Sequence, residues 1–137
     1  MITQTQTTSF KLELYEAIHN FLADTMMIAL YNANADLGAT TTAYTSVNEI
    51  TGTGYTAGGK MLTGATVTSS GTVAYVNFAN VLWSPAAFTC RGALIYNASK
   101  ANRSVAVLNF GADKTASNTF LITMPANSAD TAIIRST

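Results

Sequence analysis

Residues 91–110, RGALIYNASKANRSVAVLNF, indicate two strands joined by a tight turn. The runs 91–96 and 104–110 are rich in aliphatic, β-branched and aromatic residues, which favours strands. Between them, the segment NASKANRS is polar and contains the turn formers Asn and Ser. This stretch therefore predicts a β-hairpin with a polar tip at the surface and apolar strands that enter a core.

Further apolar runs occur on both sides of this hairpin, at intervals of roughly 8 to 15 residues. They are 26–31, 61–68, 73–78, 119–124 and 131–135. Turn residues separate several of them, among them Ser70-Gly71 and Gly111-Ala112-Asp113. The runs do not alternate with helical patterns, so a parallel α/β sheet is not expected. The pattern predicts a mainly β protein, an antiparallel β-sandwich or jelly-roll-like barrel.

The start of the chain has a different pattern. Residues 1–8 are polar and Thr/Gln-rich, which predicts a flexible N-terminal arm. Ser9 is a candidate helix N-cap, and an apolar stripe of Leu14, Ile18, Phe21 and Leu22 follows at helical spacing. We therefore expect one N-terminal amphipathic helix over about 10–23, within a single domain over 9–137.

The stretch 32–59 is rich in Thr, Ala and Gly and shows no clear core pattern. At nearly 30 residues it is longer than ordinary connections. It is expected to lie over the sheet surface or to contact a neighbouring molecule.

The composition favours a protein that functions within an assembly. Apolar residues make up 48% of the chain and charged residues 10%, against about 25% in an ordinary soluble domain. The seven basic and seven acidic residues are scattered, so no basic stripe for nucleic acid is present. No apolar run has the length of a membrane span. The start lacks the features of a signal peptide, and Cys90 is the one cysteine, so we expect synthesis in a reducing cytoplasm.

None of the motifs supports catalysis. The segment 54–61, GYTAGGKM, matches most of a P-loop, but Met61 replaces the Ser or Thr that would bind magnesium. A glycine turn leading into a strand is the preferred interpretation. His19 is the one histidine and is interpreted as structural, and Cys90 as a small buried side chain. We predict no catalytic residue, no cofactor and no metal site, and hence no enzyme.

Four segments carry a resemblance to a known group of proteins. They are AYTSVNEITGTGYTAGGKML, VAYVNFANVLWS, RGALIYNASKANRSVAVLNFG and TAIIRS. Together with the opening SFKLELYEAIHNF, they resemble small virion proteins of tailed bacteriophages, most like capsid decoration (cement) proteins. The resemblance implies an all-β protein, made in the host bacterial cytoplasm, that binds the major capsid protein on the outside of the phage head. No catalytic motif accompanies it.

Candidate interface residues follow from the two segments without a core pattern and from exposed features. They are Thr5, Thr7, Thr8, Gly52, Gly54, Tyr55, Trp83, Lys100 and Arg103. Low charge and the long 32–59 stretch also predict a dimer or trimer. Two alternatives remain open: a phage tail or neck adaptor, and a carbohydrate-binding β-sandwich that uses exposed aromatics such as Trp83.

Overall fold

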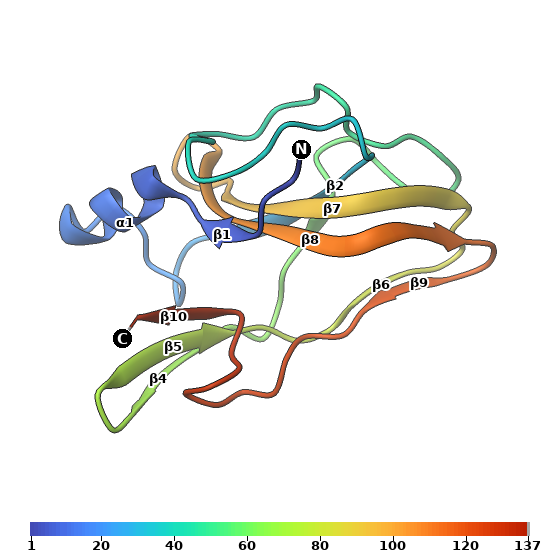
Figure 1. Cartoon of the computed structure of the whole chain (residues 1–137). Coiled ribbons are helices and arrows are strands. Elements are labelled where there is room, and N and C mark those ends of the chain that lie inside the picture. The colour runs from blue at the N-terminus through green and yellow to red at the C-terminus, as the bar shows by residue number, and fades with distance from the viewer. Residues whose placement is uncertain (137) are drawn as a thin grey trace.

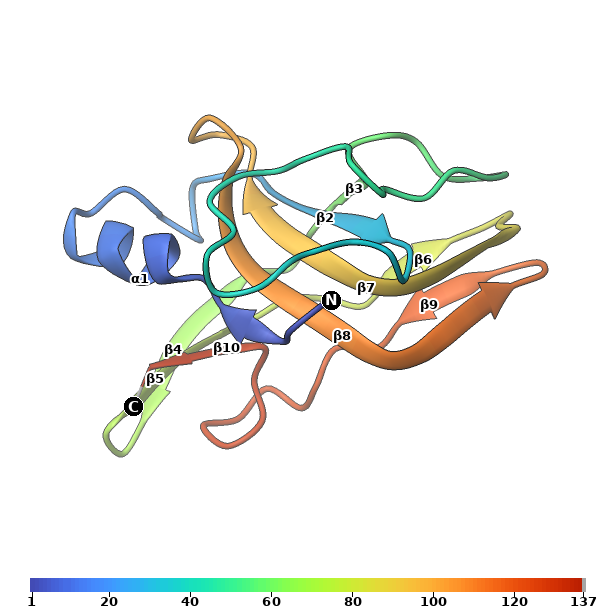
Figure 2. The same ribbon diagram turned by 45° about the horizontal axis from the view of Figure 1, so that its top comes forward.

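The hairpin at 91–110 forms the centre of a five-stranded antiparallel sheet in a computed structural model, which describes residues 1–136. Its two strands are β7 (Phe88–Asn97) and β8 (Arg103–Ala116). The strand order is β1-β8-β7-β2-β3; Figure 1 labels the first four of these strands and Figure 2 labels β3. The other three strands are β1 (Thr5–Gln6), β2 (Met26–Tyr31) and β3 (Lys60–Met61).

A second layer covers one face of this sheet (Figures 1 and 2). It contains a three-stranded sheet of order β10-β5-β4 and a two-stranded ribbon of β6 and β9. The strands are β4 (Thr66–Ser70), β5 (Val73–Asn77), β6 (Val81–Trp83), β9 (Phe120–Ile122) and β10 (Ile134–Ser136). All named pairs are antiparallel. The predicted mainly β, sandwich-like fold with an N-terminal helix is confirmed, whereas jelly-roll connectivity stays a prediction.

Both faces of the five-stranded sheet are buried. On β7, Ile95 belongs to the larger hydrophobic cluster, which lies between the two layers. Its neighbour Leu94 points to the opposite face and packs in a smaller cluster with Tyr31 and Leu37. The first part of the stretch 32–59 lies over this second face, above the sheet in Figure 1, and contributes Ala35, Leu37 and Tyr44 to the smaller cluster. Its later part reaches the larger cluster through Ile50 and Tyr55. Of the two expectations for this stretch, coverage of the sheet is therefore confirmed.

The helix is shorter than predicted. Helix α1 spans Thr8–Tyr15, and its N-cap is Thr7, whose Oγ1 accepts a hydrogen bond from the backbone N–H of Phe10. It ends at Glu16 because Ala17 adopts a left-handed conformation with φ 58°. The backbone N–H of Ile18 then bonds the carbonyl of Glu13 at 3.1 Å, which closes the helix end. The predictions of a helix over 10–23 and of a Ser9 cap are wrong.

The predicted N-terminal arm is part of the folded protein. Thr5 and Gln6 form β1 and pair with β8, and Ile2 is buried in the smaller cluster. The backbone N–H of Thr3 also bonds the carbonyl of Leu37 at 2.9 Å. Polar side chains gave no signal of this attachment, because an edge strand is held through backbone hydrogen bonds that any residue but proline can donate.

Several strand boundaries differ from the prediction, and the differences are largest at three places. The expected turn at 111–113 is a bulge within one long β8, where Arg91 alone lies opposite residues 110–113. The run 61–68 is divided between β3 and β4 by Gly64, which has φ 66°. Strand β6 was not expected at all. The glycine turn before Lys60 does lead into a strand, as predicted.

Candidate functional site

The N-terminal candidates Thr5, Thr7 and Thr8 have different environments. Thr7 is fully buried, and its hydroxyl lies 2.9 Å from Ser104 Oγ in addition to capping α1. Thr5 is half-buried within β1, and Thr8 is exposed at the start of α1. Of the three, Thr8 is the one whose side chain is available to a partner.

The candidates Gly52 and Gly54 contact the chain's own backbone. A Cβ atom at Gly52 would lie 2.6 Å from the carbonyl oxygen of Ala87. Gly54 has φ 85° and closely approaches the carbonyl of Pro85. Both glycines thus allow the 32–59 segment to pack closely on the connection between β6 and β7, which is an internal role.

Tyr55 belongs to a hydrogen-bonded network around Glu49 rather than to an exposed surface. Glu49 accepts hydrogen bonds from the hydroxyls of Tyr44 at 2.6 Å and Tyr55 at 2.5 Å. It also accepts one from the backbone N–H of Gly58 at 2.8 Å. Tyr55 Oη in turn accepts from the N–H of Leu30 in β2. The network fastens the 32–59 segment to the sheet.

Burial and the hydrogen bonds to Glu49 together raise the pKa values of the tyrosines in this network. Burial and the hydrogen bond to Glu49 raise the pKa of Tyr44 to about 12. The same two causes, burial first, raise the pKa of Tyr55 well above its usual range. Both hydroxyls are therefore neutral donors at physiological pH.

Trp83 is a core residue. It is 3% exposed and packs against the rings of Phe88, Tyr55 and Phe120, with centroid separations between 5.9 and 6.5 Å. Its assignment as an interface residue is wrong, because β6 turns its ring inward. The carbohydrate-binding alternative therefore loses Trp83, the aromatic residue that was named for it.

Lys100 and Arg103, at the tip of the β7–β8 hairpin, pair with acids of the same chain. Lys100 Nζ lies 2.9 Å from Asp24 Oδ1, and Arg103 Nη1 lies 3.2 Å from Glu13 Oε2. These cations hold the hairpin tip against the segment around α1. Both remain partly exposed, but their first partners are internal.

His19 lies between these two ion pairs. Its side chain is fully buried, and Nδ1 accepts a hydrogen bond from Asn97 Nδ2 at 3.0 Å. Because Nδ1 accepts, Nε2 carries the proton and donates to Glu13 Oε1 at 2.9 Å. Asn97 Nδ2 also donates to Asp24 Oδ2, which joins the two ion pairs into one network. Both ring nitrogens of His19 are occupied, as expected of a structural histidine.

The remaining reactive groups are isolated. Cys90 is fully buried, and burial, with a smaller contribution from Asp113, raises the pKa of its thiol to about 12. Among residues 1–136, no group of three or more His, Cys, Asp or Glu side chains could hold a metal ion. Within that same range, no helix has both the length and the apolar character needed to cross a membrane.

The surface offers an apolar groove that the sequence did not reveal. One wall comes from α1 and the loop after it, and the other from the inner faces of β4, β5 and β10. Its volume is about 450 Å³. Its apolar lining includes Leu14, Phe21, Leu22, Val67, Val76 and Ile134. We call this feature the α1–β5 groove.

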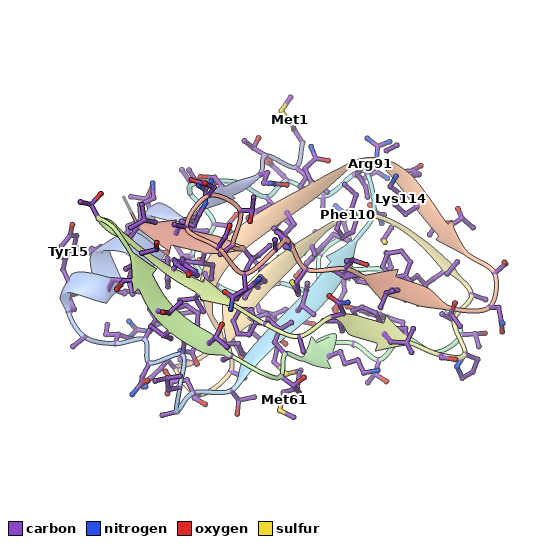
Figure 3. The ribbon with its side chains drawn as sticks, turned by 90° about the horizontal axis from the view of Figure 1, so that it is seen from below. Met1, Tyr15, Met61, Arg91, Phe110 and Lys114 are labelled. Atoms are coloured by element: carbon purple, nitrogen blue, oxygen red, sulfur yellow. The ribbon has the colours of Figure 1, made fainter. Side chains whose placement is uncertain are left out.

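A second hollow of about 410 Å³ adjoins the groove and shares Leu14 and Arg135 with it. This second hollow is also lined by Lys11 and Tyr15. Tyr15 is 92% exposed and projects at one end of the molecule in Figure 3. In the part of the chain that the structure describes, no Asp or Glu lines either hollow. The two together form a surface with an apolar part and a basic end.

Other exposed apolar side chains lie elsewhere. Leu82 and Leu121 are cross-strand partners on the β6–β9 ribbon, and each is about half exposed. Met61, labelled in Figure 3, is exposed on β3. These residues are outside the lining of both hollows.

The sequence contained one signal for the groove. The stripe of Leu14, Ile18, Phe21 and Leu22 was interpreted as the buried face of a long helix. Helix α1 stops at Tyr15, so the four residues do not form one continuous helical face. Phe21 is buried, whereas Leu14 is 40% exposed and Leu22 is 71% exposed at the edge of the groove. The opposite wall comes from strands more than 40 residues away in the chain, which no local pattern links to the stripe.

Comparison with protein-family models, with curated proteins and with solved structures gives no match for this chain.

Proposed function

We propose that this protein is a structural protein of a bacteriophage particle, a decoration (cement) protein that binds the outside of the head shell. The major capsid protein is its proposed partner. The resemblance of its segments to small virion proteins of tailed phages supports this assignment, as does a surface rich in uncharged polar residues.

The observation that carries the proposal is the contrast between internal polar groups and an open apolar groove. His19, Glu13, Asp24 and Glu49 all bind other residues of the chain. The α1–β5 groove, by contrast, is open and largely apolar. Exposed apolar surface with polar surroundings is typical of protein–protein contact. A binding role therefore fits these surfaces better than a catalytic one.

Such a protein stabilises the head shell because each bound copy buries additional protein surface. A contact of ordinary size buries about 800 Å² on each partner. Many copies, each bridging neighbouring subunits of the shell, oppose the outward pressure of packaged DNA. Each copy needs a rigid support for its binding surface, which the hydrophobic clusters on both faces of the central sheet provide.

Copy number in purified phage particles tests the assignment. Quantitative mass spectrometry of particles from the phage that encodes this chain should find it in a fixed, high ratio to the major capsid protein. Cryo-electron microscopy should then find its density on the outer shell, and removing the protein should lower the temperature at which particles release DNA.

A low copy number, with density at the neck or tail, would instead favour the alternative of an adaptor protein. Absence from the particle would contradict both assignments.

A further inference from the structure

We infer that the α1–β5 groove and the basic hollow beside it receive an apolar segment of the coat protein that carries carboxylate side chains. This inference rests on the proposed function, because it names the chemistry of the shell segment and the residues that hold it. Its evidence is the shape of the groove, the distribution of charge around it and the symmetry that a self-contact would require.

The groove is a continuation of the hydrophobic core to the surface. Val67 and Ile134 both pair with Val76 across the strands, so the three side chains share one face of the sheet. Val76 and Ile134 are buried, whereas Val67 is 49% exposed. The row therefore begins in the core and ends in the open groove. Apolar side chains from a partner would extend it.

The opposite wall is also apolar and incompletely covered. Phe21 is buried and stacks edge-on against Phe10, with a centroid separation of 5.8 Å. Leu22 beside it is 71% exposed. A partner segment between Leu22 and Val67 would remove both side chains from water, which is favourable at roughly 25 cal/mol per Å² of apolar surface.

The charges that line the basic hollow indicate which kind of partner segment would bind there. Lys11 and Arg135 line the basic hollow, and among the described residues 1–136 no acidic side chain lines either hollow. The nearby acid Glu13 already pairs with Arg103 and His19. Within residues 1–136, the ion pairs of the chain involve neither Lys11 nor Arg135. A carboxylate at this end of a partner segment would complement both cations.

A second copy of the chain is a poorer occupant. A twofold contact through this surface would bring the same patch of each copy together. Among residues 1–136, the lining of this patch holds no acidic side chain, so a second copy would bring no partner for Lys11 and Arg135 and would add like charges to the contact. An acidic segment of a different protein has the opposite effect.

Binding to shells tests the inference with charge-reversed variants. The probe is purified head shells lacking this protein, titrated with the full chain. The double variant Lys11→Glu/Arg135→Glu should weaken binding by about tenfold, since two favourable charge contacts become repulsive. Wild-type binding should also weaken between about 0.05 and 0.5 M NaCl, and that of the double variant should not.

The apolar part is tested with a matched pair of substitutions. Val67→Asp places a carboxylate in the groove and should weaken binding by about tenfold or more. Leu121→Asp introduces the same side chain at a similarly exposed position on β9, outside the groove, and should bind as the wild type does. Lys114→Glu, exposed on β8, is the matched control for charge. Thermal unfolding verifies that each variant is folded.

A zero-length carbodiimide cross-linker identifies the partner group directly, because it joins an amine to a carboxylate in contact. Lys11 should become linked to an Asp or Glu of the coat protein, and mass spectrometry of the digest locates that residue. Linkage should disappear in Lys11→Arg, which keeps the charge but lacks the reactive amine.

The outcomes separate the two proposals. If the wild type binds shells and the groove variants bind equally well, this inference is wrong and the decoration function stands. If the wild type does not bind shells, the proposed function is wrong, and the inference fails with it. Linkage of Lys11 to a second copy of this chain would identify a self-contact and would also overturn the inference.

Discussion

Several ionisable residues of this protein are of types that also occur in catalytic sites, but here they form hydrogen-bonded networks that stabilise the fold. Asp24 is the clearest case. Burial alone would raise its pKa, but hydrogen bonds from Asn97 and the backbone N–H of Asn20, together with Lys100, outweigh burial and lower the pKa from 3.8 to about 2. The charged form of Asp24 therefore stabilises the folded state.

The pH dependence of stability should show this directly. Because the folded pKa lies below the unfolded one, the stabilisation is complete above about pH 4 and is lost as the pH falls towards about 2. Its size is about 2 kcal/mol, since each pKa unit corresponds to 1.36 kcal/mol and the Asp24 side chain is 8% exposed. Urea unfolding of Asp24→Asn should show a free energy of unfolding lower by that amount at neutral pH. Between pH 4 and 2, this free energy should change less with pH than it does in the wild type. Asp36→Asn, whose side chain is 97% exposed, should behave as the wild type does.

Cys90 shows the opposite effect of burial on an ionisable group. Its thiol is fully buried and has a pKa raised to about 12, so the reactive thiolate is scarce and inaccessible. At a pH of about 8, a disulfide reagent such as DTNB should modify native protein at the rate of unfolding and denatured protein at once. An added surface thiol in Leu121→Cys should react rapidly in the native state. Fast native modification of Cys90 itself would contradict its burial.

At the scale of elements, the 32–59 segment determines how the main sheet is covered. It contains no regular strand or helix. Instead of the continuous backbone hydrogen bonds of a sheet, individual hydrogen bonds attach it to the rest of the protein. Glu49 accepts three of them, from Tyr44, Tyr55 and Gly58. Tyr96 in β7 adds another by donating to the carbonyl of Gly58 at 2.5 Å.

Replacing the carboxylate should therefore loosen this segment. In Glu49→Gln, the NH₂ group cannot accept a hydrogen bond, so at least one donor is left without a partner, at a cost of about 1–3 kcal/mol. Urea unfolding measures the loss, and amide hydrogen exchange should accelerate over 44–58 more than in β7 and β8. Glu16→Gln, exposed at the end of α1, is the matched control and should change neither quantity. Equal acceleration in all elements would show that Glu49 has no local role.

At the scale of the whole molecule, the central sheet is buried on both faces although its strands are antiparallel. Antiparallel sheets commonly leave one face in water. Here the second layer covers one face and the 32–59 segment covers the other. The α1–β5 groove lies between α1 and the second layer, outside this doubly covered sheet, and is the surface that we propose for a partner.

Adjacent residues of β7 test the double coverage. Leu94 and Ile95 are both fully buried, on opposite faces of the sheet. Leu94→Ala and Ile95→Ala should each lower the free energy of unfolding by about 2–5 kcal/mol. Leu82→Ala, at a position 47% exposed on β6, should cost much less. A small effect of Leu94→Ala alone would mean that the second face is open to water.

The sequence alone was sufficient for the strands whose residues carry strong β signals. The run 26–31 was predicted with the bounds that β2 has, and the hairpin of β7 and β8 was recognised from its apolar strands and polar tip. These predictions succeeded because β-branched and aromatic residues at turn-bounded spacing report local structure. The helix was placed correctly but made too long, since the left-handed Ala17 leaves no mark in an apolar stripe.

The sequence by itself therefore determined the fold class, the central hairpin and the presence of a single histidine and a single cysteine. Tertiary structure decided the rest: Trp83 faces the core, Lys100 and Arg103 pair within the chain, and the 1–8 segment joins the sheet. It also created the groove, by bringing Leu22 and Val67 to opposite walls of one surface. The physical reason is the distance along the chain over which each effect acts. Propensity and periodicity act between near neighbours, whereas burial and pairing depend on residues that only folding brings together.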